Sequence, residues 1–266
     1  MPWSLLTIPT MLPAFALVLF RIGGMVMTAP IFSSPAIPIR IRAAVALSLS
    51  AMAFPVILDR IPATVSLSSV ISGGVAEIMT GIAIGLSLTI IMSMADLAGM
   101  TIAQQSGLAL GEVFNPTYND QSSVLGQLYS VAFVLVFLIA GGHRECVAAV
   151  LDSYQAMPVL TGASADSGLD LVVSSTTAAF VGAIRLASPV LIALVLTTAL
   201  LGILSRAMPQ LHILTVGFTF KVMITMAIAA VTLAGAKDLL LGIVWDGAEN
   251  IREVLGLRSV ISLGVH

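Results

Sequence analysis

Long stretches without a charged residue constrain the fold of this chain more than any other feature. These stretches include residues 1–20, 22–39, 43–58, 78–95, 97–111, 121–142, 186–205 and 222–236. A membrane-spanning helix needs about 20 mostly apolar residues. Because the backbone polar groups of a span must pair within the protein, the runs predict an all-α, membrane-associated fold with five to seven membrane helices.

Composition excludes the other common classes of protein. Hydrophobic residues make up 58% of the chain and charged residues 9%. In a typical soluble domain about 45–50% of the residues are apolar and about 25% are charged. So few charges cannot cover a water-soluble globule, and disordered chains are instead rich in charge. The net charge of −2 and the absence of a basic stripe argue against nucleic acid as a partner. Membrane lipid is the expected surrounding.

Prolines divide the N-terminal part of the chain. Pro30, Pro35 and Pro38 are closely spaced, and each removes a backbone donor and disfavours helix in the residue before it. They predict a broken connection over residues 28–39, between helices at about 13–27 and 40–54. Because no charge precedes Arg21, residues 1–20 lack the basic region of a signal peptide, and we expect them to stay as membrane-embedded structure.

One helix is predicted to be longer than a bilayer is thick. Residues 75–110 contain no proline, and 36 helical residues would measure roughly 54 Å against a hydrocarbon core of about 30 Å. This element must either project beyond the bilayer or break near Gly99. In both cases the chain is packed against more than lipid.

The remaining segments are assigned from periodicity and turn residues. Serine, proline and glycine predict loops, and long apolar runs predict helices. We expect loops at 61–69, 110–123 and 161–170, a membrane helix at 121–140, a helical hairpin of 171–205 and 217–236 around 206–210, and an amphipathic helix on a membrane or partner surface at 237–258.

Nothing in the sequence indicates catalysis, a metal site or a cofactor. The chain has no HExxH, GxSxG, phosphate-binding or dinucleotide-binding motif, and His143, His212 and His266 are scattered. The one cysteine, Cys146, cannot form an intrachain disulfide and reads as a core residue. We therefore predict a protein that is not an enzyme.

Ionisable residues within apolar runs are the strongest candidate functional residues, because burying a charge is costly. Arg21, Glu77 and Asp96 are examples. Such residues either pair within a helix bundle or line an ion or proton path. We favour pairing, because the internal repeats typical of transporters are not evident. The spacings Gly81-xxx-Gly85 and Gly107-xxx-Gly111 would let helix backbones approach closely.

An ordered series of motifs over residues ~15–235 resembles one known family. The N-terminal motifs are Phe20-Arg21-Ile22-Gly23-Gly24, Ala29-Pro30-Ile31-Phe32, Arg40-Ile41-Arg42 and Glu77-Ile78-xx-Gly81-xxx-Gly85. The later ones are Ala98-Gly99-xx-Ile102-xx-Gln105-x-Gly107, Phe114-Asn115-Pro116, Gly142-His143, Ser153-Tyr154, Pro158, Arg206-xx-Pro209-Gln210-Leu211, Gly217-Phe218 and Lys221. They resemble the FliR family of flagellar type III export proteins, to which the SctT subunit of virulence secretion systems is related.

The resemblance implies a single export-gate domain of bent helical hairpins. It would consist of a FliP-like part at about 1–185, a FliQ-like hairpin at 186–236 and an amphipathic tail at 237–266. Such a protein is a structural subunit that forms a pore with FliP- and FliQ-like subunits, next to FlhB- and FlhA-like components. It passes unfolded flagellar proteins across the bacterial inner membrane at the flagellar basal body. Apolar surface would then be buried against sister subunits as well as lipid.

The resemblance also implies roles for particular residues. A plug or gate loop corresponds to 107–122, and packing or assembly positions lie in the matched motifs. The plug residues are Gly107, Gly111, Phe114, Asn115, Pro116 and Tyr118, and the assembly residues are Arg21, Glu77, Gly81, Gly85, Arg206, Pro209 and Gln210. His212 replaces the asparagine usual in the family. The alternatives are the equivalent subunit of a virulence injectisome and a proton-coupled transporter that uses Glu77 or Asp96.

Overall fold

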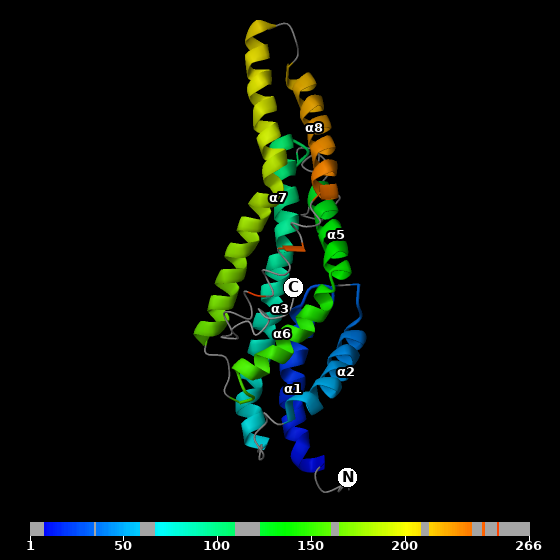
Figure 1. The fold of residues 1–266 in the computed structure, drawn as a ribbon, viewed down its shortest axis with the longest axis vertical. Helices are drawn as coiled ribbons and strands as arrows, with labels where there is room; N and C mark the ends of the chain where they lie inside the picture. The colour runs from blue at the N-terminus through cyan, green and yellow to red at the C-terminus, as the bar shows by residue number, and fades with distance from the viewer. Residues whose placement is uncertain are drawn as a thin grey trace, which may run out of the picture. The chain divides into compact units, whose positions relative to one another are not determined.

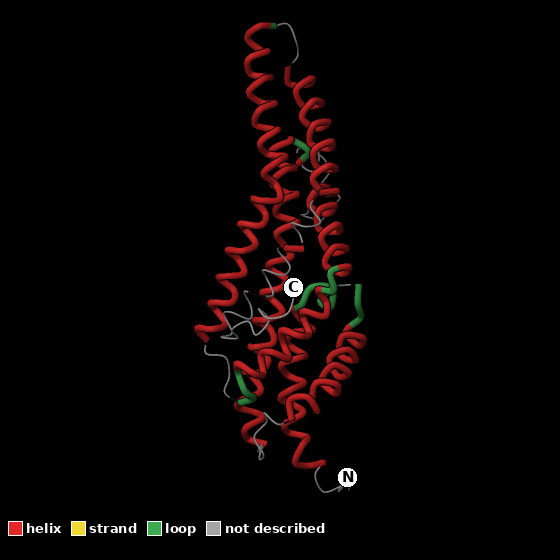
Figure 2. The backbone as a smooth tube through the Cα atoms, viewed as in Figure 1, coloured by secondary structure: helices red, strands yellow, loops and turns green. Residues whose placement is uncertain are grey.

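The computed structural model describes residues 8–34, 36–58, 67–109, 123–160, 165–208 and 213–235, together with 241–242 and 249. Within these residues every regular element is a helix and no strand occurs, which confirms the all-α prediction (Figure 2). The helices in chain order are α1 (Ile8–Thr28), α2 (Ile39–Ile57), α3 (Leu67–Ser106), α5 (Val124–Ile139), α6 (Gly142–Ala156), α7 (Ala165–Ala207) and α8 (Ile213–Gly235) (Figure 1).

The proline-rich connection between α1 and α2 is where the sequence predicts it. α1 begins at Ile8, five residues earlier than expected, because the apolar run continues the helix through Pro13. Ile31 adopts a left-handed φ of 72° within the connection. Arg42 then holds the turn from α2, because its Nη2 donates to the Ser34 carbonyl (2.7 Å) and its Nε to the Ile37 carbonyl (3.1 Å).

The long helix is continuous. α3 has 40 residues, so it measures about 60 Å, and it does not break at Gly99. It begins at Leu67, so the predicted loop 61–69 is wrong from residue 67 onward; Ser68 and Ser69 are instead accommodated in the first turn, where serine is well tolerated. Residues 61–66 of that loop lie outside the described part of the chain.

A glycine separates α5 from α6. Ser123 caps α5, with its Oγ accepting a hydrogen bond from the Gly126 amide at 2.9 Å. Gly141 has a left-handed φ of 77°, a conformation in which glycine pays no steric cost, and α6 begins directly after it. The membrane helix predicted at 121–140 corresponds to α5. The sequence did not predict α6.

The predicted hairpin is present as α7 and α8. A β-carbon built at Gly217 of α8 would lie 3.1 Å from Leu201 Cδ1 of α7, so the two helices are in contact. α7 begins at Ala165, which makes the predicted loop 161–170 wrong from residue 165 onward. The acidic and small residues there suit the first turn of a helix. The predicted tail helix at 237–258 lies almost wholly outside the described residues.

Four of the described helices are long and apolar enough to cross a membrane, or five if α5 and α6 together form one broken span. The expected range of five to seven is met only at its lower end. α8 contributes only a shorter apolar stretch, Gly217–Leu233.

The contacts divide the chain into two compact units. The first contains Met1–Ile91, Gly141–Thr177 and Val244–His266, and the second contains Met92–Ala140 and Ala178–Ile243. The core of the first unit includes Leu17, Val18, Met25 and Ile84, and that of the second includes Tyr129, Phe133, Val190 and Leu194.

Candidate functional site: a buried polar node of α1, α3 and α6

The backbones of α1 and α3 are in direct contact through glycines. A β-carbon at Gly81 would collide with the Arg21 carbonyl oxygen, and one at Gly85 would collide with the Thr28 hydroxyl. On the α1 side, a β-carbon at Gly24 would lie 2.6 Å from the Ile78 carbonyl oxygen. Small residues allow such an approach between apolar helices, where dispersion contacts replace the hydrophobic effect as the source of attraction.

Beside this contact lies a fully buried ion pair. Arg21 Nε donates to Glu77 Oε2 at 2.6 Å, and both side chains have no exposed area. Fifty-six residues separate the two partners along the chain. An isolated charge at such a position would be very costly, so the pairing of opposite charges is a condition of burying either one.

The last turn of α6 and the residues that follow it make further contacts with the pair, although the buried Arg21 Nη2 has no hydrogen-bond partner. Arg21 Nη1 donates to Ser153 Oγ at 3.2 Å and to the Met157 carbonyl oxygen at 3.0 Å. The Leu160 amide donates to Glu77 Oε1 at 3.0 Å. The Arg21 guanidinium lies over the ring of Tyr154, with Cζ 4.2 Å from the ring centroid. These six residues, Arg21, Glu77, Ser153, Tyr154, Met157 and Leu160, form a polar node.

The turn that follows α6 is held in an unusual backbone conformation. Leu160 has a φ of 75°, in the left-handed region that residues with a β-carbon rarely adopt. Its side chain lies against Gly73 of α3, where a β-carbon would be 2.6 Å from Leu160 Cδ2. Glycine at residue 73 therefore provides the space for Leu160, and Glu77 receives its amide.

The node is suited to holding helices together and offers no reactive group. Both carboxylate oxygens of Glu77 are engaged, one by a guanidinium and one by a backbone amide, which leaves it poorly placed to carry protons along a path. No group of three or more histidine, cysteine or acidic side chains within the described residues could hold a metal ion. Pairing within the helix bundle, the favoured interpretation of these two residues, is what the geometry shows.

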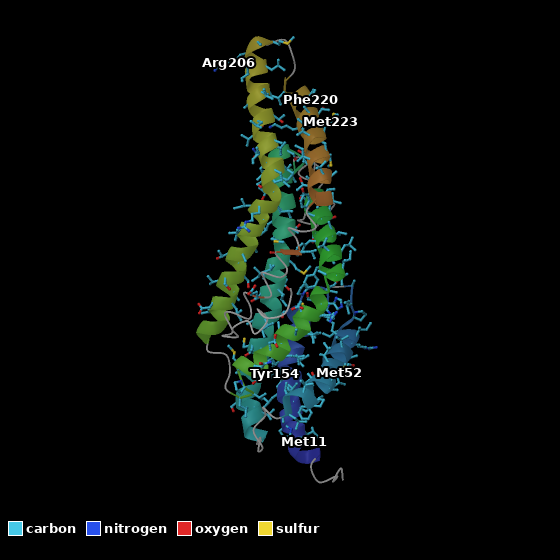
Figure 3. The ribbon with its side chains drawn as sticks, viewed as in Figure 1. Met11, Met52, Tyr154, Arg206, Phe220 and Met223 are labelled. Carbon is cyan, nitrogen blue, oxygen red and sulfur yellow. The ribbon has the colours of Figure 1, made fainter. Side chains whose placement is uncertain are left out.

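Two other predicted site residues that the structure describes are not part of the node. Gly107 ends α3 with a left-handed φ of 86°, and Arg206 is exposed in the last turn of α7 (Figure 3). The structure does not describe the remaining predicted plug and assembly residues: Gly111, Phe114, Asn115, Pro116, Tyr118, Pro209 and Gln210.

Four members of the node were not predicted as site residues. Ser153 and Tyr154 were noticed only as part of the family resemblance, and Met157 and Leu160 contribute backbone groups, which no side-chain pattern reveals. A sequence signal did exist, because Cys146, Ala149, Val150, Ser153 and Tyr154 recur at helical spacing and all are buried.

The fold and the site together define a helical membrane protein. Its buried ionisable side chains in the node, Arg21 and Glu77, pair with each other and hold helices together. The chain belongs to family 1 of the bacterial export proteins, whose model matches residues 12–245.

Known relatives cover most of the chain. It is 27% identical over 243 residues to the flagellar biosynthetic protein FliR of Caulobacter vibrioides, which spans 91% of this chain and 94% of that protein. It is 25% identical to FliR of Bacillus subtilis over 93% of this chain and 96% of the relative. The surface presentation of antigens protein SpaR of Shigella flexneri is 29% identical over 54% of this chain and 56% of its own length.

Proposed function

We propose that this chain is a structural, non-enzymatic subunit of a flagellar type III export gate in the bacterial inner membrane, at the flagellar basal body. The observation that carries the proposal is family membership over residues 12–245, together with relatives named FliR that align over more than nine-tenths of the chain. The equivalent subunit of a virulence injectisome is the second candidate. It is less favoured, because the match to SpaR covers 54% of the chain.

The helices support a role in a larger assembly. In an apolar 18-residue stretch of α2 only 17% of the residues are buried within the chain, and in such a stretch of α7 only 28%. Large apolar side chains such as Phe220 and Met223 of α8 are exposed (Figure 3). α3 is about twice as long as the hydrocarbon core is thick. Lipid cannot cover all of this surface, so FliP- and FliQ-like subunits are the proposed neighbours, with FlhB- and FlhA-like components nearby and unfolded flagellar proteins as cargo.

Residues Gly107–Ser122 form the proposed plug of the pore. Gly107 ends α3 in a left-handed conformation, which is a common way to stop a helix, and Ser123 caps the start of α5. Both ends of the segment are therefore attached to ordered helix termini. Phe114 and Tyr118 would supply apolar bulk, and Asn115-Pro116 would supply a turn.

Co-expression with FliP- and FliQ-like subunits tests the assembly. Blue-native electrophoresis should show one large complex that contains this chain. Arg206→Ala in the last turn of α7 should weaken the complex, whereas Arg185→Ala, another exposed arginine on the same helix, should not. If this chain stays monomeric while its partners assemble, the proposal is wrong.

Membrane conductance tests the plug. Cells that express the assembled gate with Phe114→Ala should leak small ions, while Phe220→Ala, which truncates an exposed phenylalanine of α8, should leave the gate closed. Normal conductance in both variants would rule out residues 107–122 as the seal without affecting the assembly result.

A further inference from the structure

We infer that α6 opens and closes as a unit on α1 and α3, and that the turn Met157–Leu160 is the latch that keeps it closed. The inference goes beyond the proposed function and is tested on the isolated chain, so it does not depend on the export activity. Three features of the polar node and of α6 support it.

The C-terminal end of α6 makes polar contacts with both α1 and α3. Ser153 and the Met157 carbonyl accept from Arg21, and the Leu160 amide donates to Glu77. Tyr154 adds its ring against the Arg21 guanidinium and donates its hydroxyl to the Val18 carbonyl oxygen at 3.3 Å. All of these contacts reach α1 or α3 within one helical turn and the loop that follows.

The rest of the buried face of α6 is made of small side chains. Cys146, Ala149 and Val150 are each 2% exposed or less, but together they bury little apolar area, and the free energy of burial scales with that area. The opposite side of α6 carries charged residues such as Arg144 and tolerates contact with water. The polar contacts at the C-terminal end of α6 are therefore an important part of the attachment of the helix.

Left-handed residues lie at both ends of the element. Gly141 precedes α6 with φ 77°, and Leu160 follows it with φ 75°. Glycine allows the chain to pivot at little cost, whereas the leucine is strained and keeps its conformation only because Glu77 binds its amide and Gly73 receives its side chain. Opening would release this strain. The free-energy difference between the closed and open states is therefore smaller than the number of contacts suggests.

Cys146 provides a direct reporter of opening. It is the only cysteine of the chain, it lies on the buried face of α6 and it is 1% exposed. A maleimide can react with it only after α6 separates from its neighbours, so the labelling rate follows the population of the open state. The experiment measures this rate on the full chain purified in detergent micelles.

Weakening the latch should accelerate the labelling. Glu77→Gln, which removes the charge that Arg21 and the Leu160 amide share, should raise the rate about tenfold or more. Asp170→Asn, which neutralises an exposed acid of α7, should not change it. Circular dichroism must show unchanged helix content, so that faster labelling reports local opening.

A milder pair of variants covers the case in which Glu77→Gln fails to fold. The hydroxyls of Ser153 and Ser174 each donate to the carbonyl three residues earlier, at 2.6 and 3.1 Å, but only Ser153 also accepts from Arg21. Ser153→Ala should therefore label several-fold faster, and Ser174→Ala at the rate of the unchanged chain. Equal rates in the two variants would overturn the latch.

A disulfide across the latch gives the opposite perturbation. A β-carbon at Gly73 would lie 3.9 Å from Leu160 Cα, which is compatible with a bond between Gly73→Cys and Leu160→Cys. Oxidation should slow the labelling of the Cys146 peptide at least about tenfold relative to the same chain after reduction, as read by mass spectrometry. An unchanged rate after complete oxidation would show that Cys146 is reached without opening at the turn, and the inference would fail.

Discussion

Exchanging the two charges of the polar node should not restore stability, even though it restores an ion pair. The perturbation is Arg21→Glu combined with Glu77→Arg. In the native node the Leu160 amide donates to the carboxylate, and the Met157 carbonyl accepts from the guanidinium. After the exchange a donor would face a donor and an acceptor would face an acceptor. The backbone of the turn therefore fixes which helix must carry which charge.

The magnitude follows from the contacts that are lost. Glu77→Gln removes the charge from the 2.6 Å ion pair and weakens the 3.0 Å hydrogen bond of the Leu160 amide, and breaking one side of a buried pair costs about 3–5 kcal/mol. The exchanged chain regains the attraction between charges but leaves two half-buried backbone groups unpaired, at about 1–3 kcal/mol each. We expect it to be about 2–6 kcal/mol less stable than the native chain, a loss comparable to that of Glu77→Gln.

Unfolding in mixed detergent micelles with increasing sodium dodecyl sulfate, followed by circular dichroism, measures the free energy of unfolding. The native chain, Arg21→Glu, Glu77→Arg and the exchanged chain form a double-mutant cycle, which separates the attraction of the pair from the contribution of the turn. If the exchanged chain recovered to within about 1 kcal/mol of the native chain, the pair would be acting through charge alone. The orientation imposed by Met157 and Leu160 would then be refuted.

The same measurement checks three further substitutions. Gly81→Ala should lower the free energy of unfolding by about 2 kcal/mol or more, because its β-carbon meets backbone of α1. Gly23→Ala, whose β-carbon meets nothing, should raise it by about 0.5–1 kcal/mol, because the unfolded chain loses backbone entropy. Equal effects of the two substitutions would disprove the close helix contact. Ser123→Ala should cost about 1 kcal/mol through loss of the α5 cap, and no loss would mean that the cap is not needed.

The positions of the long helices could be predicted because the bilayer imposes them. A run without charge must satisfy its own backbone, so runs of apolar residues translate directly into α1, α2, α3, α5 and α7. Their ends were harder to place. Serine and acidic residues near 67 and 165 read as loops, yet the same residues stabilise the first turn of a helix, and a single sequence does not separate the two uses.

Gly99 shows a second limit of the sequence. The sequence predicts that the over-long helix either projects beyond the bilayer or breaks near Gly99. In the structure a β-carbon at Gly99 would lie 2.5 Å from the Leu125 carbonyl oxygen and 2.6 Å from Gly126 Cα, so the glycine is there to admit the backbone of α5. A glycine that bends a helix and one that lets a neighbour approach look the same until the neighbour is known.

α6 was missed because its charges interrupt the apolar run used to find helices. Its buried stripe is present in the sequence, but Arg144 and Asp152 break the apolar pattern, and no element is predicted for residues 142–156. Its partners were equally out of reach, since Arg21 contacts groups 132 and 136 residues away. Local patterns can identify a charge that needs a partner, but only the tertiary fold shows which one.

The position of the pair explains why an apolar protein retains it. The glycines restrict how α1 and α3 align, because a shift by one turn would place a residue with a β-carbon where Gly81 or Gly85 now admits the backbone of α1. A buried arginine and glutamate with directional hydrogen bonds are satisfied in one register only, since a shift by one turn would leave both charges unpaired. The pair adds little net stability relative to apolar residues of the same size, but it selects the alignment of α1 and α3, and through Met157 and Leu160 it extends that selection to α6.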